Sequence, residues 1–195
     1  MPSGTQAPDG SSRARAAGAR IEVPLERARE LTALDEAIRA TAAGSGRVVL
    51  LEGAGGIGKT LLLAHATQRA QASGVTVLRA RGGELERQFP FGVALQLFEP
   101  YLSAASPRER RRVFAGAAVH AQSLLSGEVV GGEGSAPDFS VLHGLHWLVA
   151  NIAERRPLLL AVDDAQWADE PSLRFLFKSL AGACQMIELS PCISE

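Results

Sequence analysis

Eight consecutive residues, Gly53 to Thr60, carry the strongest chemical signal in this sequence of 195 residues. They read Gly-Ala-Gly-Gly-Ile-Gly-Lys-Thr and fit the pattern G-x-x-x-x-G-K-[ST]. Glycines in such a loop let backbone N–H groups turn toward phosphates, and the N-terminus of the following helix points its partial positive charge at the same oxygens. Lys59 would then bind the β- and γ-phosphates of a nucleotide, and Thr60 would offer its hydroxyl to Mg²⁺.

All eight are therefore candidate nucleotide-binding residues: Gly53, Ala54, Gly55, Gly56, Ile57, Gly58, Lys59 and Thr60. Two alternatives remain open. The glycines could form a turn that binds no ligand, or they could bind a dinucleotide through the pattern G-x-G-x-x-G. The dinucleotide interpretation is disfavoured because Arg79 and Arg81 stand where such a site needs an acidic residue at the end of the second strand.

A pair of acidic residues, Asp163 and Asp164, follows five aliphatic residues at 158–162. A short apolar run predicts a buried strand, and ligands bind at the carboxyl edge of the strands in open α/β sheets. Asp163 would order the Mg²⁺ shell, and Asp164 would polarise the attacking water. The candidate catalytic residues are thus Asp164 and Lys59, and the candidate metal ligands are Thr60 and Asp163. The alternative is a solvated acidic turn at the end of a strand.

Other polar residues give weaker signals. Asp169 could be a functional acid or the N-cap of a helix that begins just after it. His143 and His146 are three residues apart but lack the glutamate partners of a dimetal bundle, so we interpret them as helix-packing residues. Cys184 and Cys192 match no metal-ligand spacing, and we expect reduced thiols in a cytoplasm.

The elements that would position these groups alternate between helix and strand. Apolar residues at helical spacing predict a helix before the loop, and short apolar runs predict strands on either side of the helix that follows it. The expected elements are a helix over 28–43, a strand over 48–52, a helix over 59–72 and a strand over 76–80. A strand, glycine turn, helix and second strand form a βαβ unit with a right-handed crossover. The sequence therefore predicts an α/β fold with a mostly parallel sheet.

A long helical stretch separates the second strand from the acidic one. Further helices are expected over 92–102, from 107 onward, over 141–153 and over 171–180, with a Gly-, Ser- and Glu-rich loop over 126–138. Ser106 and Glu109 stand three apart as a capping box around Pro107. The run Arg110 to Arg112 invites a nucleic-acid interpretation, but consecutive helical positions spread around the helix, which favours a solvated face.

The composition excludes several classes of protein. Twenty basic and 21 acidic residues give a net charge of −1, so no overall field draws the chain to nucleic acid or to an anionic membrane. The longest apolar runs are far shorter than the roughly 20 residues of a membrane-spanning helix. We therefore expect no membrane segment and a cytoplasmic location. Residues 1–20 lack the apolar segment of a secretory signal and predict a disordered tail.

With both halves of a phosphate site placed, the sequence resembles the nucleotide-binding domain of signal-transduction (STAND-type) ATPases related to AAA proteins. The likeness is closest to the large ATP-binding LuxR-type transcriptional regulators. It spans Leu25 to about Leu180 and rests on Gly53 to Thr60, on Phe89 to Val93 together with Gln96 to Pro100, and on Leu158 to Asp169. This resemblance implies a P-loop NTPase three-layer sandwich, with residues 21–182 as an AAA-like ATPase domain and 91–153 as its helical insertion.

The resemblance also implies binding of ATP with Mg²⁺, slow hydrolysis used as a switch, and nucleotide-dependent self-association. It gives the same roles to four residues, position by position: Lys59, Thr60, Asp163 and Asp164. The family commonly has a Gly-Arg-Glu motif near the adenine. Residues 26–28 keep only its arginine, so Arg27 is a further candidate nucleotide-binding residue. The alternatives to a hydrolysing switch are an interaction module that binds ATP without hydrolysis, and a non-functional fragment.

Residues 183–195 depart from the family pattern. LuxR-type regulators continue into a sensor strand, a winged-helix segment, helical repeats and a C-terminal helix-turn-helix. We therefore expect a truncated regulator with an atypical C-terminal tail, incomplete C-terminal strands and no DNA-binding part of its own. In P-loop ATPases of this type the sensor strand lies between the loop strand and the acidic strand, and Met186 to Leu189 would serve as a short replacement for it.

Overall fold

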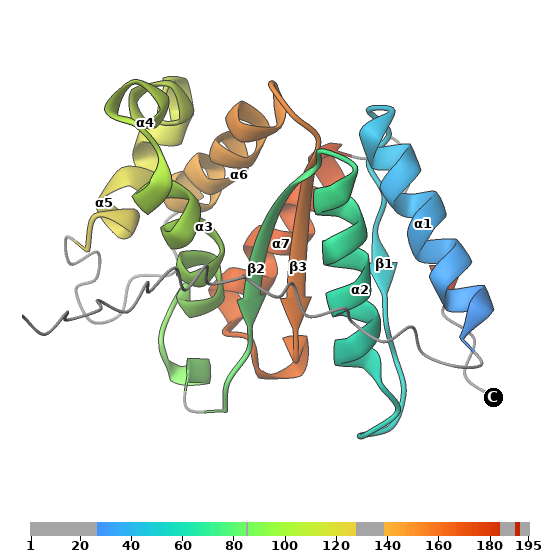
Figure 1. Cartoon of the computed structure of the whole chain (residues 1–195). Helices are drawn as coiled ribbons and strands as arrows, with labels where there is room; N and C mark the ends of the chain where they lie inside the picture. Colours follow the sequence, from blue (N-terminus) through green and yellow to red (C-terminus); the bar gives the residue numbers. More distant parts are fainter. Residues whose placement is uncertain (1–26, 85, 128–138, 184–189, 192–195) are drawn as a thin grey trace, which may run out of the picture.

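A computed structural model describes residues 27–84, 86–127, 139–183 and 190–191 of the chain. Its elements before the acidic strand are α1 (Ala28–Ala42), β1 (Val49–Leu50), α2 (Lys59–Ala72), β2 (Thr76–Arg81), η1 (Glu86–Gln88), α3 (Gly92–Ala104), α4 (Pro107–Val113), η2 (Gly116–Ala121), α5 (Gln122–Leu125) and α6 (Phe139–Ala153). They are followed by β3 (Leu158–Asp163), η3 (Ala165–Trp167), α7 (Glu170–Ala183) and β4 (Ser190–Pro191). Figure 1 shows their arrangement.

The described strands pair in parallel, as predicted, but they form two separate pairs, and no described ladder joins β1 and β2 of the expected βαβ unit into one sheet. β2 pairs with β3 over six residues, in a register that runs from Thr76 opposite Leu158 to Arg81 opposite Asp163. β1 pairs with β4 through a ladder of only two residues. The register of β2 and β3 brings the last residue of β2 level with the first of the two acidic residues, so their carboxyl ends share one edge.

Helices cover both faces of the β2–β3 pair. Successive side chains of a strand point to opposite faces, so alternate residues of β2 and β3 pack against different helices. Leu78 of β2 and Leu160 of β3 belong to a large apolar cluster with α3, α6 and α7. Val77 and Leu159 pack instead against a smaller cluster built by α1 and α2. Figure 1 shows α3 and α6 on one side of these strands and α1 and α2 on the other. Burial on two faces explains why the strands read as continuous apolar runs.

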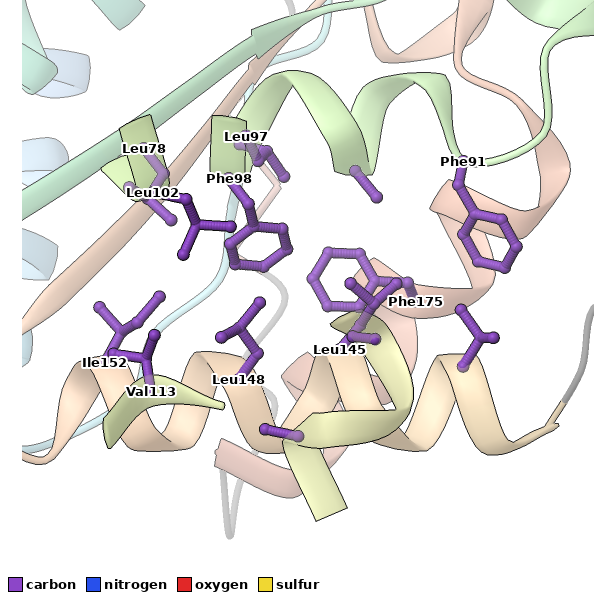
Figure 2. Close-up of a cluster of buried hydrophobic side chains, with 14 of the residues drawn as sticks. Leu78, Phe91, Leu97, Phe98, Leu102, Val113, Leu145, Leu148, Ile152 and Phe175 are labelled. Carbon is purple, nitrogen blue, oxygen red and sulfur yellow. The ribbon is translucent and has the colours of Figure 1, made fainter. Parts of the chain in front are cut away.

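The larger cluster forms the main core, and Figure 2 shows its side chains between α3, α6 and α7. Phe98 of α3 and Phe175 of α7 are both fully buried, and their ring centroids lie 5.7 Å apart. Leu145 and Leu148 of α6 are also fully buried beside them. Removing a buried aromatic ring of this kind costs about 3–5 kcal/mol of stability. The core therefore fixes α3 and α7 against each other next to the carboxyl edge of the strands.

The start of α4 differs in part from the predicted capping box. The Ser106 hydroxyl accepts a hydrogen bond from the Glu109 backbone N–H at 3.2 Å, as predicted. The Glu109 carboxylate, however, does not return to Ser106. It accepts instead from the Tyr101 hydroxyl at 2.9 Å and from Arg112 at 2.7 Å. Arg112 of the arginine run is therefore partly drawn inward, whereas Arg110 and Arg111 are exposed.

Two element lengths also differ from expectation. β1 has two residues where a strand over 48–52 was predicted, since its described ladder partner is also two residues long. α3 runs to Ala104 rather than to residue 102, and it keeps Pro100 inside the helix. The remaining helix and strand ends lie within about three residues of their predicted positions.

Several predictions fall on residues outside those described. These are the tail over 1–20, most of the loop over 126–138, both cysteines and the replacement strand Met186 to Leu189. The described partner of β1 begins at the next residue, Ser190. Over the described ranges, none of the helices combines the length and the apolar character that crossing a bilayer requires.

Candidate nucleotide-binding site

The loop between β1 and α2 turns through backbone conformations that favour glycine. Gly53 has a φ of 147°, and a Cβ at this position would lie 2.1 Å from Cδ1 of Ile57. Gly58, directly before the first residue of α2, has a φ of 88°. Glycine adopts positive φ without steric cost, whereas other residues do so rarely. Residues 53–57 are exposed, so the turned loop is open to a ligand.

Lys59 folds back over this loop. Its Nζ donates hydrogen bonds to the carbonyl of Gly53 at 2.7 Å and to the carbonyl of Ala54 at 2.8 Å. An ionised acceptor such as phosphate binds an ammonium group more strongly than a neutral carbonyl does. The Lys59 ammonium thus lies at the loop, in contact with acceptors that a phosphate can replace. This geometry fits the role predicted for Lys59.

Thr60 and Asp163 meet although they are far apart in the sequence. The Thr60 hydroxyl donates to the Asp163 carboxylate, with distances of 3.0 Å to Oδ2 and 3.3 Å to Oδ1. Thr60 belongs to the first turn of α2 and Asp163 is the last residue of β3. Both offer hard oxygen atoms, and Mg²⁺ typically takes one or two protein oxygens and completes its shell with phosphate and water. The two predicted metal ligands therefore lie together, and their chemistry fits Mg²⁺.

Asp164 adopts a left-handed backbone conformation with a φ of 51°. Its Oδ2 accepts a hydrogen bond from Arg81 Nε at 2.9 Å and forms an ion pair with Arg81 Nη2 at 2.8 Å, and its Oδ1 accepts from Gln166 at 3.2 Å. These hydrogen bonds, Arg81 first, hold the pKa of the Asp164 carboxyl below its usual value. The same pairing raises the pKa of Arg81. Asp164 is therefore an ionised acid that an arginine holds at the end of β3.

Arg27 also reaches the loop. Its Nη2 donates to the carbonyl of Ile57 at 2.9 Å, and its Nη1 donates to Glu30 at 2.8 Å. The hydrogen bond from Arg27 lowers the pKa of the Glu30 carboxyl. Arg27 thus contacts the backbone of the phosphate loop from the start of α1. Its predicted proximity to an adenine stays a prediction.

Three residues, Arg81, Gly82 and Gln96, lie at the carboxyl edge of the strands but were not predicted as site residues from the sequence. Arg81 was noted only because it stands where a dinucleotide site needs an acid. Its backbone N–H donates to Oε1 of Gln96 at 3.0 Å. Gly82 follows it, and a Cβ there would lie 2.4 Å from the backbone oxygen of Asp164. The pair of glycines at 82–83 directly after a strand was the available signal for this close approach.

These residues line an open cavity of about 490 Å³ at the carboxyl ends of β2 and β3, and no residue of the phosphate loop lines it. Arg81, Gln96, Asp164 and Trp167 contribute side chains to its wall. Arg81 and Asp164 come from the ends of two neighbouring parallel strands, which is the edge where ligands bind in α/β sheets. The cavity therefore lies at Asp164, the residue after Asp163, which contacts Thr60.

The hydrogen bonds of Asp169 favour the N-cap over the functional acid. Its carboxylate is buried, and Oδ1 accepts from the Ser172 backbone N–H at 2.8 Å at the start of α7. The same carboxylate accepts from the backbone N–H groups of Phe91 at 2.7 Å and Val93 at 3.2 Å, at the start of α3. One acid thus caps two helices, which the sequence alone did not indicate.

The parallel strands, the glycine loop and the adjoining Thr60–Asp163 contact define an α/β protein of the P-loop nucleotide-binding class. A family model described as AAA ATPase domain matches residues 23–191, which is most of the chain. The chain therefore belongs to the AAA ATPase domain family. No curated protein and no solved structure matches the sequence.

Proposed function

We propose that this chain binds ATP together with Mg²⁺ at the loop Gly53 to Thr60 and uses the bound nucleotide as a switch. The hydrogen bond between Thr60 and Asp163 carries the proposal. It joins the end of the glycine loop to the end of the acidic strand across 103 residues of sequence. A Mg²⁺ shared by Thr60 and Asp163 needs their oxygens close together, and this hydrogen bond supports that arrangement.

The chain's own residues divide the work of the site. The loop N–H groups and Lys59 hold the phosphates, and the oxygens of Thr60 and Asp163 hold the metal. When bound, Mg²⁺ would neutralise part of the negative charge of the phosphates. Asp164 is ionised and is the acid that would orient and polarise the attacking water. Arg27, held against Ile57, lies beside the loop from the side of α1 and would contact the nucleotide there.

The proposal extends to a STAND-type switch of the kind found in LuxR-type transcriptional regulators, acting in the cytoplasm. Two sequence segments that carry this resemblance, Phe89 to Pro100 and Leu158 to Asp169, contact each other through the buried carboxylate of Asp169. This contact supports the view that the two segments occur in the same sequence because they pack against each other in the fold. A switch of this class hydrolyses ATP slowly and associates with its own kind when the nucleotide is bound.

A thermal melt with and without Mg²⁺ and ATP tests nucleotide binding. A ligand that binds only the folded form stabilises it by about 2.7 kcal/mol at one hundred times Kd. For a chain of this size that corresponds to a rise in Tm of roughly 5–10 °C. We expect this rise in the wild type and its loss in Lys59→Ala.

Arg69→Ala is the matched control, because Arg69 lies on the same helix but is paired with Asp35 rather than with the loop. It should keep the full nucleotide-dependent rise in Tm. A wild-type melt that is cooperative and indifferent to Mg²⁺ and ATP would contradict the proposal.

A second candidate function, ATP binding without hydrolysis, is favoured by one observation. Both carboxylate oxygens of Asp164 already accept hydrogen bonds, from Arg81 and from Gln166, which leaves the carboxylate fewer acceptor sites for an attacking water. Phosphate release at saturating ATP separates the two functions. A slow release that falls in Asp164→Asn supports the hydrolysing switch, and a rate equal to that of Asp164→Asn supports the binding module.

A further inference from the structure

We propose that a second anion site lies between α4 and the end of α6, where Arg108, Arg112 and Arg155 bind a small molecule that carries a phosphate group. The three arginines line a cavity of about 620 Å³, together with Ser106 and Glu109. Cavities that bind small molecules typically have volumes of about 300–1,000 Å³. The cavity is therefore large enough for a phosphate group and the molecule attached to it.

The three arginines come from two elements that are distant in the sequence. Arg108 and Arg112 are four residues apart on α4 and therefore lie on the same side of that helix. Arg155 directly follows the end of α6 by two residues. Asn151 of α6 donates a hydrogen bond to the carbonyl of Val113, the last residue of α4, at 2.8 Å. This contact holds the end of α6 against α4 and so keeps the arginines together.

The charges of the cavity wall favour an anion. The wall contains three guanidinium groups but only one carboxylate, that of Glu109, which leaves two positive charges unbalanced. Each guanidinium carries five N–H donors and no acceptor. The cavity is therefore rich in donors and poor in acceptors, which is the reverse of what a cation needs.

Most of these donors are not used within the part of the chain that the structure describes. Arg112 donates through Nη2 to Glu109 at 2.7 Å, but its Nε is buried and meets no acceptor among the described residues. Arg155 lies 3.8 Å from the Glu109 carboxylate, which is an ion-pair distance but too long for a hydrogen bond. Its side chain is 67% exposed. An anion in the cavity would supply the missing acceptors.

Phosphate is the anion that fits these donors best. Its several oxygens can accept from more than one guanidinium, and arginine binds it through two parallel hydrogen bonds. Glu109 accepts from Tyr101 and from Arg112, so we assign it the role of holding Arg112 in position. Arg108 and Arg155 then supply the charge that meets the phosphate.

The other arginines of α4 lie outside the cavity. Arg110 and Arg111 are exposed and do not line it. A nucleic acid binds to a row of cations that follows its backbone, whereas the cations of this site gather around one cavity. The arrangement therefore suits a small molecule better than a nucleic acid.

The cavity is separate from the candidate nucleotide site. Arg155 lies just before β3, at its amino end, whereas Asp163 is the last residue of that strand. Figure 1 shows α4 at the top of the molecule and the loop between β1 and α2 at the bottom. A ligand in the cavity would therefore leave the nucleotide site open.

The experiment is an NMR titration of the full chain with inorganic phosphate, at an ionic strength kept constant with chloride. The backbone amides of α4 and of residues 154–156 monitor the cavity, and those of residues 53–60 monitor the loop. We expect saturable shifts at the cavity amides of the wild type. Loss of one charge-assisted hydrogen bond weakens binding by about tenfold, so we expect this loss in Arg155→Gln and again in Arg108→Gln.

Arg156→Gln is the matched control. It removes the same charge one residue from Arg155, but Arg156 does not line the cavity, so this variant should keep the wild-type affinity. Arg108, Arg155 and Arg156 are all exposed, so their replacement should leave the fold intact, and unchanged amide positions elsewhere in the spectrum verify this.

Three results would overturn the proposal. Equal weakening in Arg155→Gln and Arg156→Gln would mean that phosphate responds only to the general charge of the surface. Citrate that binds at the cavity as tightly as phosphate would contradict the preference for phosphate. Cavity amides that do not shift would show that no anion binds there. Shifts at the loop are read separately, so the proposed nucleotide function can fail or succeed independently of this site.

Discussion

The Asp169 carboxylate accepts a hydrogen bond from the Phe91 backbone N–H at 2.7 Å, and so joins the turn after the acidic strand to the start of α3. Phe91 adopts a left-handed conformation with a φ of 63°, which turns the chain into the helix at this contact. Ser172 adds a second link, since its hydroxyl accepts from the Ala94 N–H at 3.0 Å. The two helices that flank the main core are thus tied at their N-termini beside the candidate site.

The double cap predicts a large loss of stability in Asp169→Ala. Three backbone N–H groups would lose their acceptor in a buried place, and the free energy of unfolding should fall by about 3 kcal/mol. Urea denaturation of the wild type and the variant measures this difference in the free energy of unfolding. Asp35→Ala is the comparison, because it breaks only the exposed pair with Arg69 and should cost about 0.5 kcal/mol. Equal losses in the two variants would refute the double cap.

Gly82→Ala should destabilise the chain by overpacking. The added Cβ would lie 2.4 Å from the Asp164 backbone oxygen, so the strand end or the acidic turn must shift, at a cost of about 2–3 kcal/mol. Gly44→Ala is the control, since its φ is +84° but no atom lies within 4 Å of the new Cβ. That variant should lose about 1 kcal/mol from backbone strain alone. The comparison is made by chemical denaturation, and a smaller loss for Gly82→Ala than for Gly44→Ala would contradict it.

Thr60→Ala should weaken nucleotide binding only when Mg²⁺ is present. The variant removes the hydroxyl that meets Asp163 but leaves the loop and Lys59 in place. We expect about a tenfold loss of affinity for ATP with Mg²⁺, and little change in the presence of a chelator. Thr60→Ser retains the hydroxyl and should bind as the wild type does. A loss of the same size without metal would mean that Thr60 acts on the nucleotide by another route.

His146 of α6 predicts a dependence of stability on pH. Burial, followed by the charges of Lys178 and His143, lowers the pKa of His146, and its Nδ1 is buried without a hydrogen-bond partner. The unfolded chain therefore binds the proton more readily than the folded chain. Stability should fall as pH drops below the ordinary histidine value of about 6.5, until the lower folded pKa is passed.

Replacing His146 by glutamine should remove this contribution to the slope, measured as the urea midpoint between pH 5 and pH 7.5. His65→Gln on α2 serves as the control and should keep it. A slope that persists unchanged in His146→Gln would show that other groups titrate in this range.

The sequence predicted the local elements well because their signals are local. The Leu-rich run before Asp163 and the glycines before Lys59 specify a strand and a turn wherever they occur. Capping of α4 by Ser106 was equally visible in the sequence. The Thr60–Asp163 contact followed from the known chemistry of the loop rather than from any local pattern.

The relationships missed from the sequence are those between distant segments. Nothing near Arg81 indicates that its guanidinium pairs with Asp164, because the contact depends on the register of β2 against β3. The second role of Asp169, at the start of α3, likewise depends on how α3 packs against α7. Glu109 departed from the capping box because Tyr101 and Arg112 compete for its carboxylate, and such competition is decided by tertiary packing.

The brevity of the β1–β4 ladder has a consequence for amide exchange. β2 and β3 share six paired residues, whereas the described ladder of β1 has only two, so the strand that leads into the loop is held largely by the packing of Val49 and Leu51 against α1 and α2. Its backbone amides should exchange with solvent hydrogen faster than those of β2. A nucleotide bound at the loop would slow that exchange. The exchange rate of the β1 amides would then show whether the nucleotide site is occupied.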